Sequence, residues 1–265
     1  MGTAQTDSKQ RFSNRVEDYV RYRPGYPREV VGLLRGECGL APESVVADIG
    51  SGTGLLTRLF LENGNVVYGV EPNAAMREAG EQQLETFRHF CSVAGSAEST
   101  TLPDASVDFV VVGQAFHWFD RAAARREFVR ILKPQGWVVL VWNERPVNAT
   151  PFMNDYELLL QRHGTGYSTI QHVHAEQAGL ENFYGAAQMR MRDFENQQQV
   201  DWEGLRGRVM SASYTPPPGD PGHKPMMNDL ERLFAAHQAG NRVTIHYRTR
   251  VYYGRLEPGA GRKDA

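Results

Sequence analysis

One ten-residue stretch, Val45–Gly54, constrains the fold of this chain more than any other. It begins as a short apolar run, which is typical of a buried parallel strand. Glycines then stand at the alternate positions 50, 52 and 54, and residues 55–63 predict a helix that ends before Gly64. A strand, a glycine turn and a helix in this order form the first unit of a nucleotide-binding α/β sheet.

The spacing of these glycines indicates which kind of ligand the turn could bind. A dinucleotide-binding turn has the pattern GxGxxG and would need a glycine in place of Leu55. Asp48, two residues before the first glycine, would also repel a pyrophosphate that approached the N–H groups at the start of the helix. A carboxylate there suits a positively charged ligand. S-adenosylmethionine carries an ammonium group and a sulfonium group and has no phosphate.

The segment Asp48–Gly54, DIGSGTG, together with Glu71 after the next predicted strand, resembles motif I of the class I S-adenosylmethionine-dependent methyltransferases. Within that family the chain is similar to methyltransferase type 11 proteins and to trans-aconitate methyltransferase-like enzymes that act on small molecules. The resemblance implies a Rossmann-like α/β fold, with a seven-stranded, mostly parallel sheet, an antiparallel last strand and helices on both faces. It also implies an N-terminal helical lid and a second helical lid inserted before the last strand.

Polar residues after the predicted strands are candidates for binding the cofactor. Glu71 closes the second strand, where its carboxylate can accept both ribose hydroxyls. By resemblance, Ala97 and Glu98 lie beside the adenine ring, Gln114 lies near the methionine part, and Met76 either touches the adenosine or packs the start of its helix. The predicted cofactor-binding residues are Tyr22, Arg23, Asp48, Gly50, Ser51, Gly52, Glu71, Pro72, Met76, Ala97, Glu98 and Gln114.

The stretch Gly113–Asp120 follows the fourth predicted strand and is rich in polar and aromatic side chains. Strand ends of this kind line the ligand crevice in α/β sheets. The resemblance puts His117 and Trp118 near the transferred methyl group, so His117 is the predicted catalytic residue, as a general base or as a residue that orients the acceptor. Alternatively, His117 has a local capping or packing role, and Trp118 packs under the following helix.

Four residues are predicted to bind the methyl acceptor, namely Trp118, Trp142, Asn143 and Tyr214. Trp142 and Asn143 end the fifth predicted strand. Tyr214 belongs to a segment that is longer than the minimal fold needs, and we interpret this segment as a lid over the acceptor site.

The segment before the first strand is rich in tyrosine and arginine and resembles an N-terminal lid. Tyr22 and Arg23 would then fold over the cofactor and the acceptor. Arginine holds carboxylates in a bidentate fork, so Arg23 suggests an anionic group in the acceptor or the carboxylate of the cofactor. Alternatively, Tyr22 packs the first helix on the domain and Arg23 lies on the surface.

The pattern of apolar residues predicts the remaining elements. Helices are expected at 11–22, 28–37, 74–87, 121–132, 152–162, 202–213 and 225–239. Strands are expected at 66–70, 90–93, 109–112, 137–142, within 184–200 and at 242–253, and a loop-rich stretch at 163–185. Gly136 is expected to be left-handed after the helix at 121–132, although the family usually has glycine where this chain has Gln135. The predicted domains are the lid at 1–40, the cofactor-binding core at 41–150, its C-terminal part with the lid insertion at 151–256, and a flexible tail at 257–265.

Composition narrows the range of partners. The 265 residues carry a formal net charge of −2, so no overall basic field points to nucleic acid. No apolar run approaches the length of a membrane span. Two cysteines form no metal set, and His172 and His174 form no metal-binding pattern, so no metal site is predicted. We expect a cytoplasmic monomer or homodimer with a small-molecule methyl acceptor as partner, and no nucleic acid or membrane partner.

The resemblance implies methyl transfer by in-line displacement, in which the protein mainly has to align the reactants and exclude water. The main alternative is a catalytically silent S-adenosylmethionine-binding protein or partner subunit, and the run from Gln114 to Trp118 argues against it. A nucleotide-dependent oxidoreductase is a third possibility, which Leu55 disfavours.

Overall fold

The computed structural model describes residues 21–167, 177–185 and 189–256. The predicted tail at 257–265, His172 and His174 lie outside these residues, as does most of the helix predicted at 11–22. Within the described ranges, no helix combines the length and the apolar character needed to span a bilayer.

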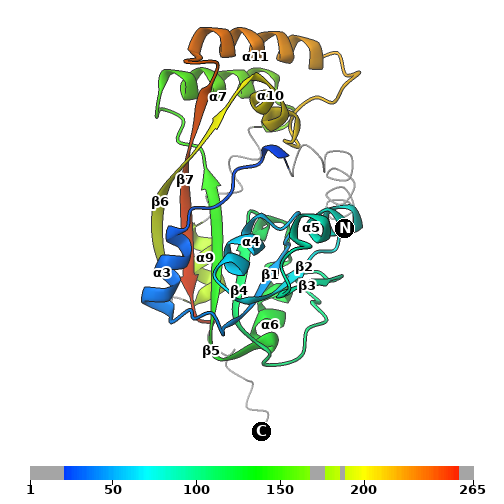
Figure 1. The fold of residues 1–265 in the computed structure, drawn as a ribbon, viewed down its shortest axis with the longest axis vertical. Helices are drawn as coiled ribbons and strands as arrows, with labels where there is room; N and C mark the ends of the chain where they lie inside the picture. The colour runs from blue at the N-terminus through cyan, green and yellow to red at the C-terminus, as the bar shows by residue number, and fades with distance from the viewer. Residues whose placement is uncertain (1–20, 168–176, 186–188, 257–265) are drawn as a thin grey trace. The chain divides into compact units, whose positions relative to one another are not determined.

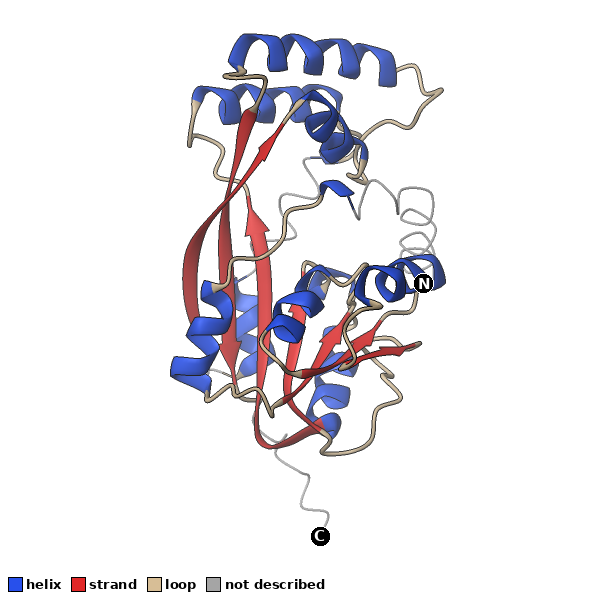
Figure 2. Cartoon of the chain, in the orientation of Figure 1, coloured by secondary structure: helices blue, strands red, loops and turns tan. Residues whose placement is uncertain are grey.

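A seven-stranded sheet organises the fold (Figure 1). Its strands are β1 (Val45–Ile49), β2 (Val66–Val70), β3 (Phe90–Val93), β4 (Val107–Gly113), β5 (Leu132–Glu144), β6 (Arg190–Val200) and β7 (Val243–Gly254). They lie in the order β3-β2-β1-β4-β5-β7-β6. The pairs among β1 to β5 are parallel, and β7 runs opposite to β5 and β6 on either side of it (Figure 2). The predicted mostly parallel sheet with an antiparallel last strand is therefore confirmed.

The helices lie within a few residues of their predicted positions. They are α3 (Glu29–Cys38), α4 (Leu55–Glu62), α5 (Ala74–Leu84), α6 (Arg121–Ile131), α7 (Pro151–His163), α9 (Gln177–Tyr184), α10 (Trp202–Met210) and α11 (His223–His237), with a 3-10 turn, η1, at Phe116–Trp118. The exception is α9, which lies in the stretch expected to be loop-rich.

One turn differs from its prediction. Gln135, and not Gly136, has the left-handed backbone, with φ +70°. β5 already begins at Leu132, and its pairing with β4 shifts register between Val107 and Phe109. Position 136 instead requires glycine because a side chain does not fit there: a Cβ would lie 2.7 Å from the Leu132 side chain.

The chain divides into two compact units. The large unit consists of the described residues of 28–142, 176–193 and 250–265, and the small unit consists of those of 1–27, 143–175 and 194–249. The long strands β5, β6 and β7 contribute residues to both units.

The core of the large unit covers both faces of its sheet. Ala47 and Ile49 on β1 pack in one cluster with α6 and α9, and both are fully buried. Val46 and Asp48 alternate with them, point to the opposite face, and are equally inaccessible. α4 contacts β1 and β2 and buries Phe60 outside the first cluster. Burial on both faces explains why these strands read as continuous apolar runs.

The small unit has a core of its own. α7 and α11 pack side by side, and α10 and part of β7 complete the cluster, which includes Met153, Leu160, Leu205, Leu230 and Ile245 (Figure 1). The segment inserted between β6 and β7 forms α10 and α11. Of the predicted N-terminal lid, residues 21–27 belong to the small unit and α3 belongs to the large unit. The predicted lid roles and domain boundaries stay predictions.

Candidate functional site

The turn after β1 is held by backbone hydrogen bonds and by left-handed glycines. The N–H groups of Gly50 and Ser51 donate to the Val70 carbonyl at 2.8 and 3.2 Å. Gly50, Gly52 and Gly54 have φ values of +70°, +57° and +86°, which residues with a Cβ adopt only at a cost. α4 then begins without a side-chain cap, because its N-cap residue is a glycine. The start of a helix with such a cap is a position where ligands commonly bind.

Asp48 is buried next to this turn, with 1% of its surface exposed. Its Oδ2 accepts a hydrogen bond from the Thr57 hydroxyl at 2.6 Å. Its Oδ1 has no hydrogen-bond partner among the described residues. Burial, opposed by the Thr57 hydrogen bond and reinforced by the charge of Glu71, raises the pKa of Asp48 to about 7. A cationic group beside Oδ1 would supply the missing partner and favour the ionised carboxylate.

Glu71, directly after β2, links the glycine turn to the start of α5. Its Oε2 accepts from the Gly52 N–H at 3.0 Å and its Oε1 accepts from the Asn73 N–H at 2.8 Å. Asn73 in turn caps α5 by accepting from the Met76 N–H at 3.2 Å. Met76 is buried, and Pro72 is exposed. Each carboxylate oxygen can accept more than one hydrogen bond, so a carboxylate can bind hydroxyl groups as well as backbone N–H groups.

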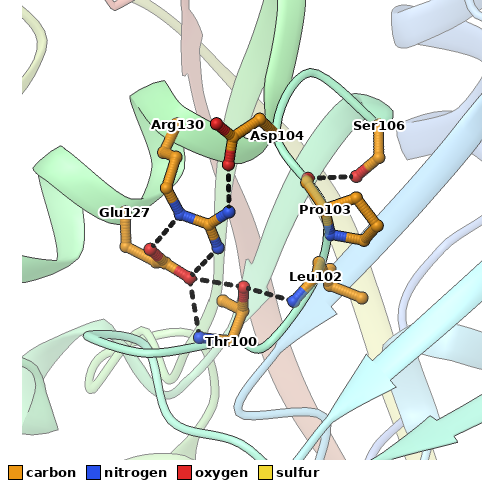
Figure 3. Close-up of polar contacts among 7 residues, drawn as sticks. All are labelled: Thr100, Leu102, Pro103, Asp104, Ser106, Glu127 and Arg130. Carbon is orange, nitrogen blue, oxygen red and sulfur yellow. Dashed lines mark hydrogen bonds and ion pairs between the residues drawn. The ribbon is translucent and has the colours of Figure 1, made fainter.

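The segment that carries Ala97 and Glu98 is fixed by a residue that the sequence did not single out. Glu127 on α6 is buried, and its Oε1 accepts from the Thr100 N–H at 2.8 Å and from the Thr100 hydroxyl at 2.6 Å (Figure 3). Arg130 donates to both Glu127 oxygens at 2.6 and 2.8 Å. In the same segment Ala97 is buried. Glu98 Oε1 accepts from a backbone N–H at the start of α6 at 3.0 Å. The one sequence signal for this network was an acid three residues before an arginine on a helix.

We expect the Glu127→Gln substitution to weaken the protein in a pH-dependent way. Hydrogen bonds from Arg130, which outweigh burial, together with those from Thr100, lower the pKa of Glu127 to about 2. Because the pKa of Glu127 is lower in the folded state, its ionised carboxylate stabilises the protein at pH values above the unfolded-state pKa of 4.5. This stabilisation disappears as the pH falls toward 2. The free energy of unfolding should fall by about 2 kcal/mol at pH 7.

Urea unfolding at pH 7, 5 and 3 measures this effect. The difference between Glu127→Gln and the wild type should shrink by more than half between pH 5 and pH 3. The exposed Glu85, replaced by Gln, serves as the control and should show little change. A loss that is the same at every pH would mean that the charge of Glu127 does not hold this segment.

The segment after β4 exposes one aromatic side chain and anchors another. Gln114 has a left-handed backbone with φ +58°, and its N–H donates to the Val141 carbonyl at 3.0 Å. Phe116 is buried in the core, and the rings of His117 and Trp118 lie 4.6 Å apart. Trp118 is 39% exposed, which does not fit a tryptophan that packs under α6. A left-handed glutamine is a strained position of the kind that collects at functional sites.

Trp142, predicted to bind the acceptor, lies in the core of the large unit. It is 6% exposed and meets the rings of Phe116 and Tyr252 edge-on, at 6.3 and 5.6 Å. Its indole N–H has no hydrogen-bond partner among the described residues. The side chain is therefore mainly a packing residue with one unused donor, and its role toward an acceptor stays a prediction.

Asn143, the next residue, begins the small unit and connects three of its segments. Its side-chain N–H donates to the Gly25 carbonyl at 3.1 Å, and its Oδ1 accepts from Thr249 at 2.6 Å and from Asn196 at 3.2 Å. Asn196 also donates to Gly25, at 3.0 Å. Asn143 thus holds the segment before α3, a role that the sequence did not predict.

The other predicted residues from the lid segments also lie in the small unit. The Tyr22 ring packs on α10 at Gly207, where a Cβ would come within 2.1 Å of it. Arg23 donates to the Ser211 carbonyl at 2.8 Å, and Tyr214 is 9% exposed. The structure therefore gathers Asp48, Gly50, Ser51, Gly52, Glu71, Pro72, Met76, Ala97, Glu98, Gln114, His117, Trp118 and Trp142 in the large unit, and Tyr22, Arg23, Asn143 and Tyr214 in the small unit.

The acceptor groups of the large unit fit a cationic ligand that also carries hydroxyl groups. Two carboxylates flank the glycine turn, and the one at Asp48 is buried with an unpartnered oxygen. Carboxylates at these places accept from ammonium and hydroxyl groups and repel phosphate. Left-handed glycines also let the backbone approach a ligand closely.

Comparison with known proteins gives consistent results. Residues 47–140 match the family described as a methyltransferase domain. The chain is 30% identical over 202 residues to an uncharacterized methyltransferase of Schizosaccharomyces pombe, which covers 76% of this chain and 77% of that protein. It is 38% identical over 145 residues to an uncharacterized methyltransferase of Mycobacterium tuberculosis, covering 55% of this chain and 57% of that one.

One similar solved structure is the phosphoethanolamine N-methyltransferase 2 of Haemonchus contortus in complex with phosphomonomethylethanolamine and S-adenosylhomocysteine. Its TM-score is 0.57 at 15% identity, over 96% of this chain and 59% of that one. At this level of identity the likeness concerns the fold.

Proposed function

This chain belongs to the class I S-adenosylmethionine-dependent methyltransferases, and on that premise we propose that it methylates a small-molecule acceptor by in-line displacement. The cofactor of the family is S-adenosylmethionine, with S-adenosylhomocysteine as the product. When bound, S-adenosylmethionine supplies a methyl group that its sulfonium activates for displacement.

The observation that carries the proposal is the buried carboxylate of Asp48, which has one oxygen without a partner beside a left-handed glycine turn. In the proposed site Asp48 holds the cationic methionine part, and Glu71 accepts from the ribose hydroxyls. Glu98 and the backbone at Ala97 hold the adenine edge, and Gln114 contacts the methionine part. The energy of these contacts would serve to position the acceptor for displacement rather than to change the chemistry of the methyl group.

His117 is proposed to orient the acceptor and to take its proton where the acceptor atom carries one. Histidine is suited to this because its side chain titrates near neutral pH. A carboxylate acceptor is already ionised and would use His117 for orientation alone. The exposed Trp118 ring next to His117 supports an acceptor site over a silent cofactor-binding protein, because ligand pockets are lined mainly by hydrophobic and aromatic side chains.

A methyl-transfer assay tests the proposed function. Full-length protein freed of bound ligand is first titrated with S-adenosylhomocysteine by calorimetry, and heat that saturates at one site per chain is expected. Radiolabelled S-adenosylmethionine is then mixed with cell extract that has been separated by size. Label should enter a compound of the fraction below about 1 kDa that chromatography separates from S-adenosylmethionine; label that enters only protein or nucleic acid would contradict a small-molecule acceptor. Binding without transfer to any fraction would favour the silent alternative.

Replacing His117 with Ala should lower kcat for the identified acceptor by about 100-fold, because a positioned acid or base contributes about that much. The affinity for S-adenosylhomocysteine should change little, since His117 is proposed to face the acceptor. His117→Gln is the matched control, because it keeps a polar side chain of similar size but not the base. An unaltered turnover in His117→Ala would remove His117 from the mechanism, and rescue by Gln would limit it to orientation.

A further inference from the structure

A second chemically distinctive place lies in the small unit. Two arginines and three tyrosines gather there, and we call them the arginine–tyrosine cluster, with the members Arg145, Arg208, Tyr156, Tyr167 and Tyr214. Arg208 is 5% exposed and Tyr156 is 1% exposed. Arginine is rarely buried so deeply without an anionic partner.

Arg208 and Tyr156 each have an unused polar atom. The Nε of Arg208 donates to the Tyr247 hydroxyl at 3.2 Å, but its buried Nη1 has no hydrogen-bond partner among the described residues. The buried hydroxyl of Tyr156 has none there either. Burial raises the pKa of Tyr156 to about 12, and the positive charge of Arg208 acts in the opposite direction. The two side chains are therefore near enough to interact electrostatically. Tyr247, the hydrogen-bond partner of Arg208, belongs to the same buried cluster as Tyr156, so both unpartnered atoms lie in the core of the small unit.

Arg145 contacts all three tyrosines of the cluster. It donates to the Tyr167 hydroxyl at 2.6 Å and to the Tyr214 hydroxyl at 3.1 Å, and its guanidinium lies 5.3 Å over the Tyr156 ring. Its carboxylate neighbour is Glu157 at 3.8 Å, which also accepts from the Tyr167 hydroxyl at 2.7 Å. The Glu157 carboxylate therefore balances the charge of Arg145, whereas the hydrogen-bond partner of Arg208 is a neutral hydroxyl.

The positive charge of the cluster affects the pKa of Tyr214. Burial alone would raise the pKa of Tyr214, but the charges of Arg145, Arg208 and Arg23 outweigh burial and bring it below its ordinary value. An arginine cannot lose its proton to escape this situation, because its own pKa is above about 12. A buried guanidinium without a counterion is costly, so the cluster is complete only when an anion joins it.

We propose that the arginine–tyrosine cluster binds an oxyanion, namely the carboxylate or phosphate group of a small molecule. The planar guanidinium of Arg208 can hold either group in a bidentate fork, and the Tyr156 hydroxyl can donate a further hydrogen bond.

Calorimetry on the full-length protein tests the inference, with sodium phosphate and sodium malonate as probes and sodium chloride at equal ionic strength as the reference. Saturable binding of one probe or both is expected, and the preferred probe identifies the oxyanion. Tyr156→Phe should weaken the binding about tenfold, as for a lost hydrogen bond to a charged group. Its melting temperature should not fall, because the removed hydroxyl has no partner to lose.

A second variant and a control complete the test. Arg208→Gln should weaken the binding about 100-fold or more, and Tyr156→Phe keeps the test valid if Arg208→Gln does not fold. Tyr184→Phe is the matched control, because the buried Tyr184 hydroxyl lies in the large unit and contacts two carbonyls, at 3.3 and 3.2 Å. That variant should lose stability and keep its affinity for the anion.

The inference is overturned if neither probe binds saturably, or if both binding variants keep wild-type affinity. Titration of the same samples with S-adenosylhomocysteine separates this inference from the proposed function. Uptake of S-adenosylhomocysteine without anion binding removes the anion site alone. Anion binding without uptake of S-adenosylhomocysteine removes the methyltransferase proposal and leaves the cluster as an anion site.

Discussion

The Asp48→Asn variant should be more stable than the wild type at pH 8 and should bind the cofactor about 100-fold more weakly. The two effects have one cause, which is the buried carboxylate. Without a ligand it is a buried, partly satisfied charge, and with a cationic ligand it becomes a buried ion pair. Removing the charge relieves the free protein and deprives the ligand of its partner.

The sign of the stability effect follows from the direction of the pKa shift. The pKa of Asp48 rises from 3.8 to about 7 on folding, so the folded state binds the proton more tightly than the unfolded state. Above pH 7 the buried carboxylate therefore lowers the free energy of unfolding by about 4 kcal/mol. This loss of stability becomes smaller as the pH falls toward 3.8. Asparagine keeps an acceptor for Thr57 but puts an N–H where Oδ1 was. We therefore expect a gain of about 2 kcal/mol at pH 8, or about 4 °C in melting temperature.

Thermal unfolding at pH 8 and pH 5 measures the first effect, and calorimetry with S-adenosylmethionine measures the second. The stabilisation should be smaller at pH 5 than at pH 8. The ratio of wild-type to variant affinity should rise about tenfold from pH 6 to pH 8, because Asp48 ionises over that range and the titration of the ligand itself cancels in the ratio.

Two controls separate charge from local structure. Thr57→Val removes the hydrogen bond at Oδ2 and keeps the carboxylate, so its affinity for the cofactor should fall much less than that of Asp48→Asn. Glu85→Gln removes an exposed carboxylate of the same unit and should change neither quantity. Full cofactor affinity in Asp48→Asn would show that Asp48 serves only to hold Thr57 and the start of α4.

The sequence predicted the sheet and the glycine turn well because both follow from local chemistry. Apolar runs between breakers indicate β1 and place β2 at its observed bounds, since a strand that is largely buried on both faces consists mainly of apolar residues. Asp120 occupies the N-cap of α6, where aspartate is a preferred residue, and its side chain accepts from two N–H groups at 3.0 Å.

The contacts that could not be predicted join residues that lie far apart in the sequence. Glu127 meets Thr100 across 27 residues, and Arg208 meets Tyr247 across 39, so no local pattern marks either pair. The left-handed Gln135 was missed for a different reason. Glycine is the residue expected at such a turn, and here the neighbouring Gly136 is retained for its missing side chain.

Gly50→Ala should lower the free energy of unfolding by about 3 kcal/mol. The backbone of Gly50 is left-handed, which costs a residue with a Cβ about 1 kcal/mol. The added Cβ would also lie 2.7 Å from the Cβ of Ala115, an atom that moves only with its backbone. Overpacking of this kind costs about 1–3 kcal/mol, and it would displace the segment that carries Gln114.

Denaturant unfolding of a double variant separates the two contributions. Ala115→Gly in the Gly50→Ala background removes the steric conflict and should restore about half of the loss, leaving the strain of the left-handed backbone. Gly32→Ala in α3 is the control, because no atom lies within 4 Å of the new Cβ, and it should stabilise the protein by about 0.5–1 kcal/mol. No recovery in the double variant would show that Ala115 is not the obstacle.

Gly52→Ala gives the contrasting result on the same turn. Its Cβ would meet only the flexible end of Met76, at 3.4 Å, so the loss of stability should stay near the 1 kcal/mol of backbone strain. If the turn cradles S-adenosylmethionine, the new methyl group instead stands where the backbone must approach the ligand, and affinity should fall more than tenfold. Gly50 would then be kept for packing and Gly52 for the ligand. Wild-type affinity in Gly52→Ala would move the cofactor away from this turn.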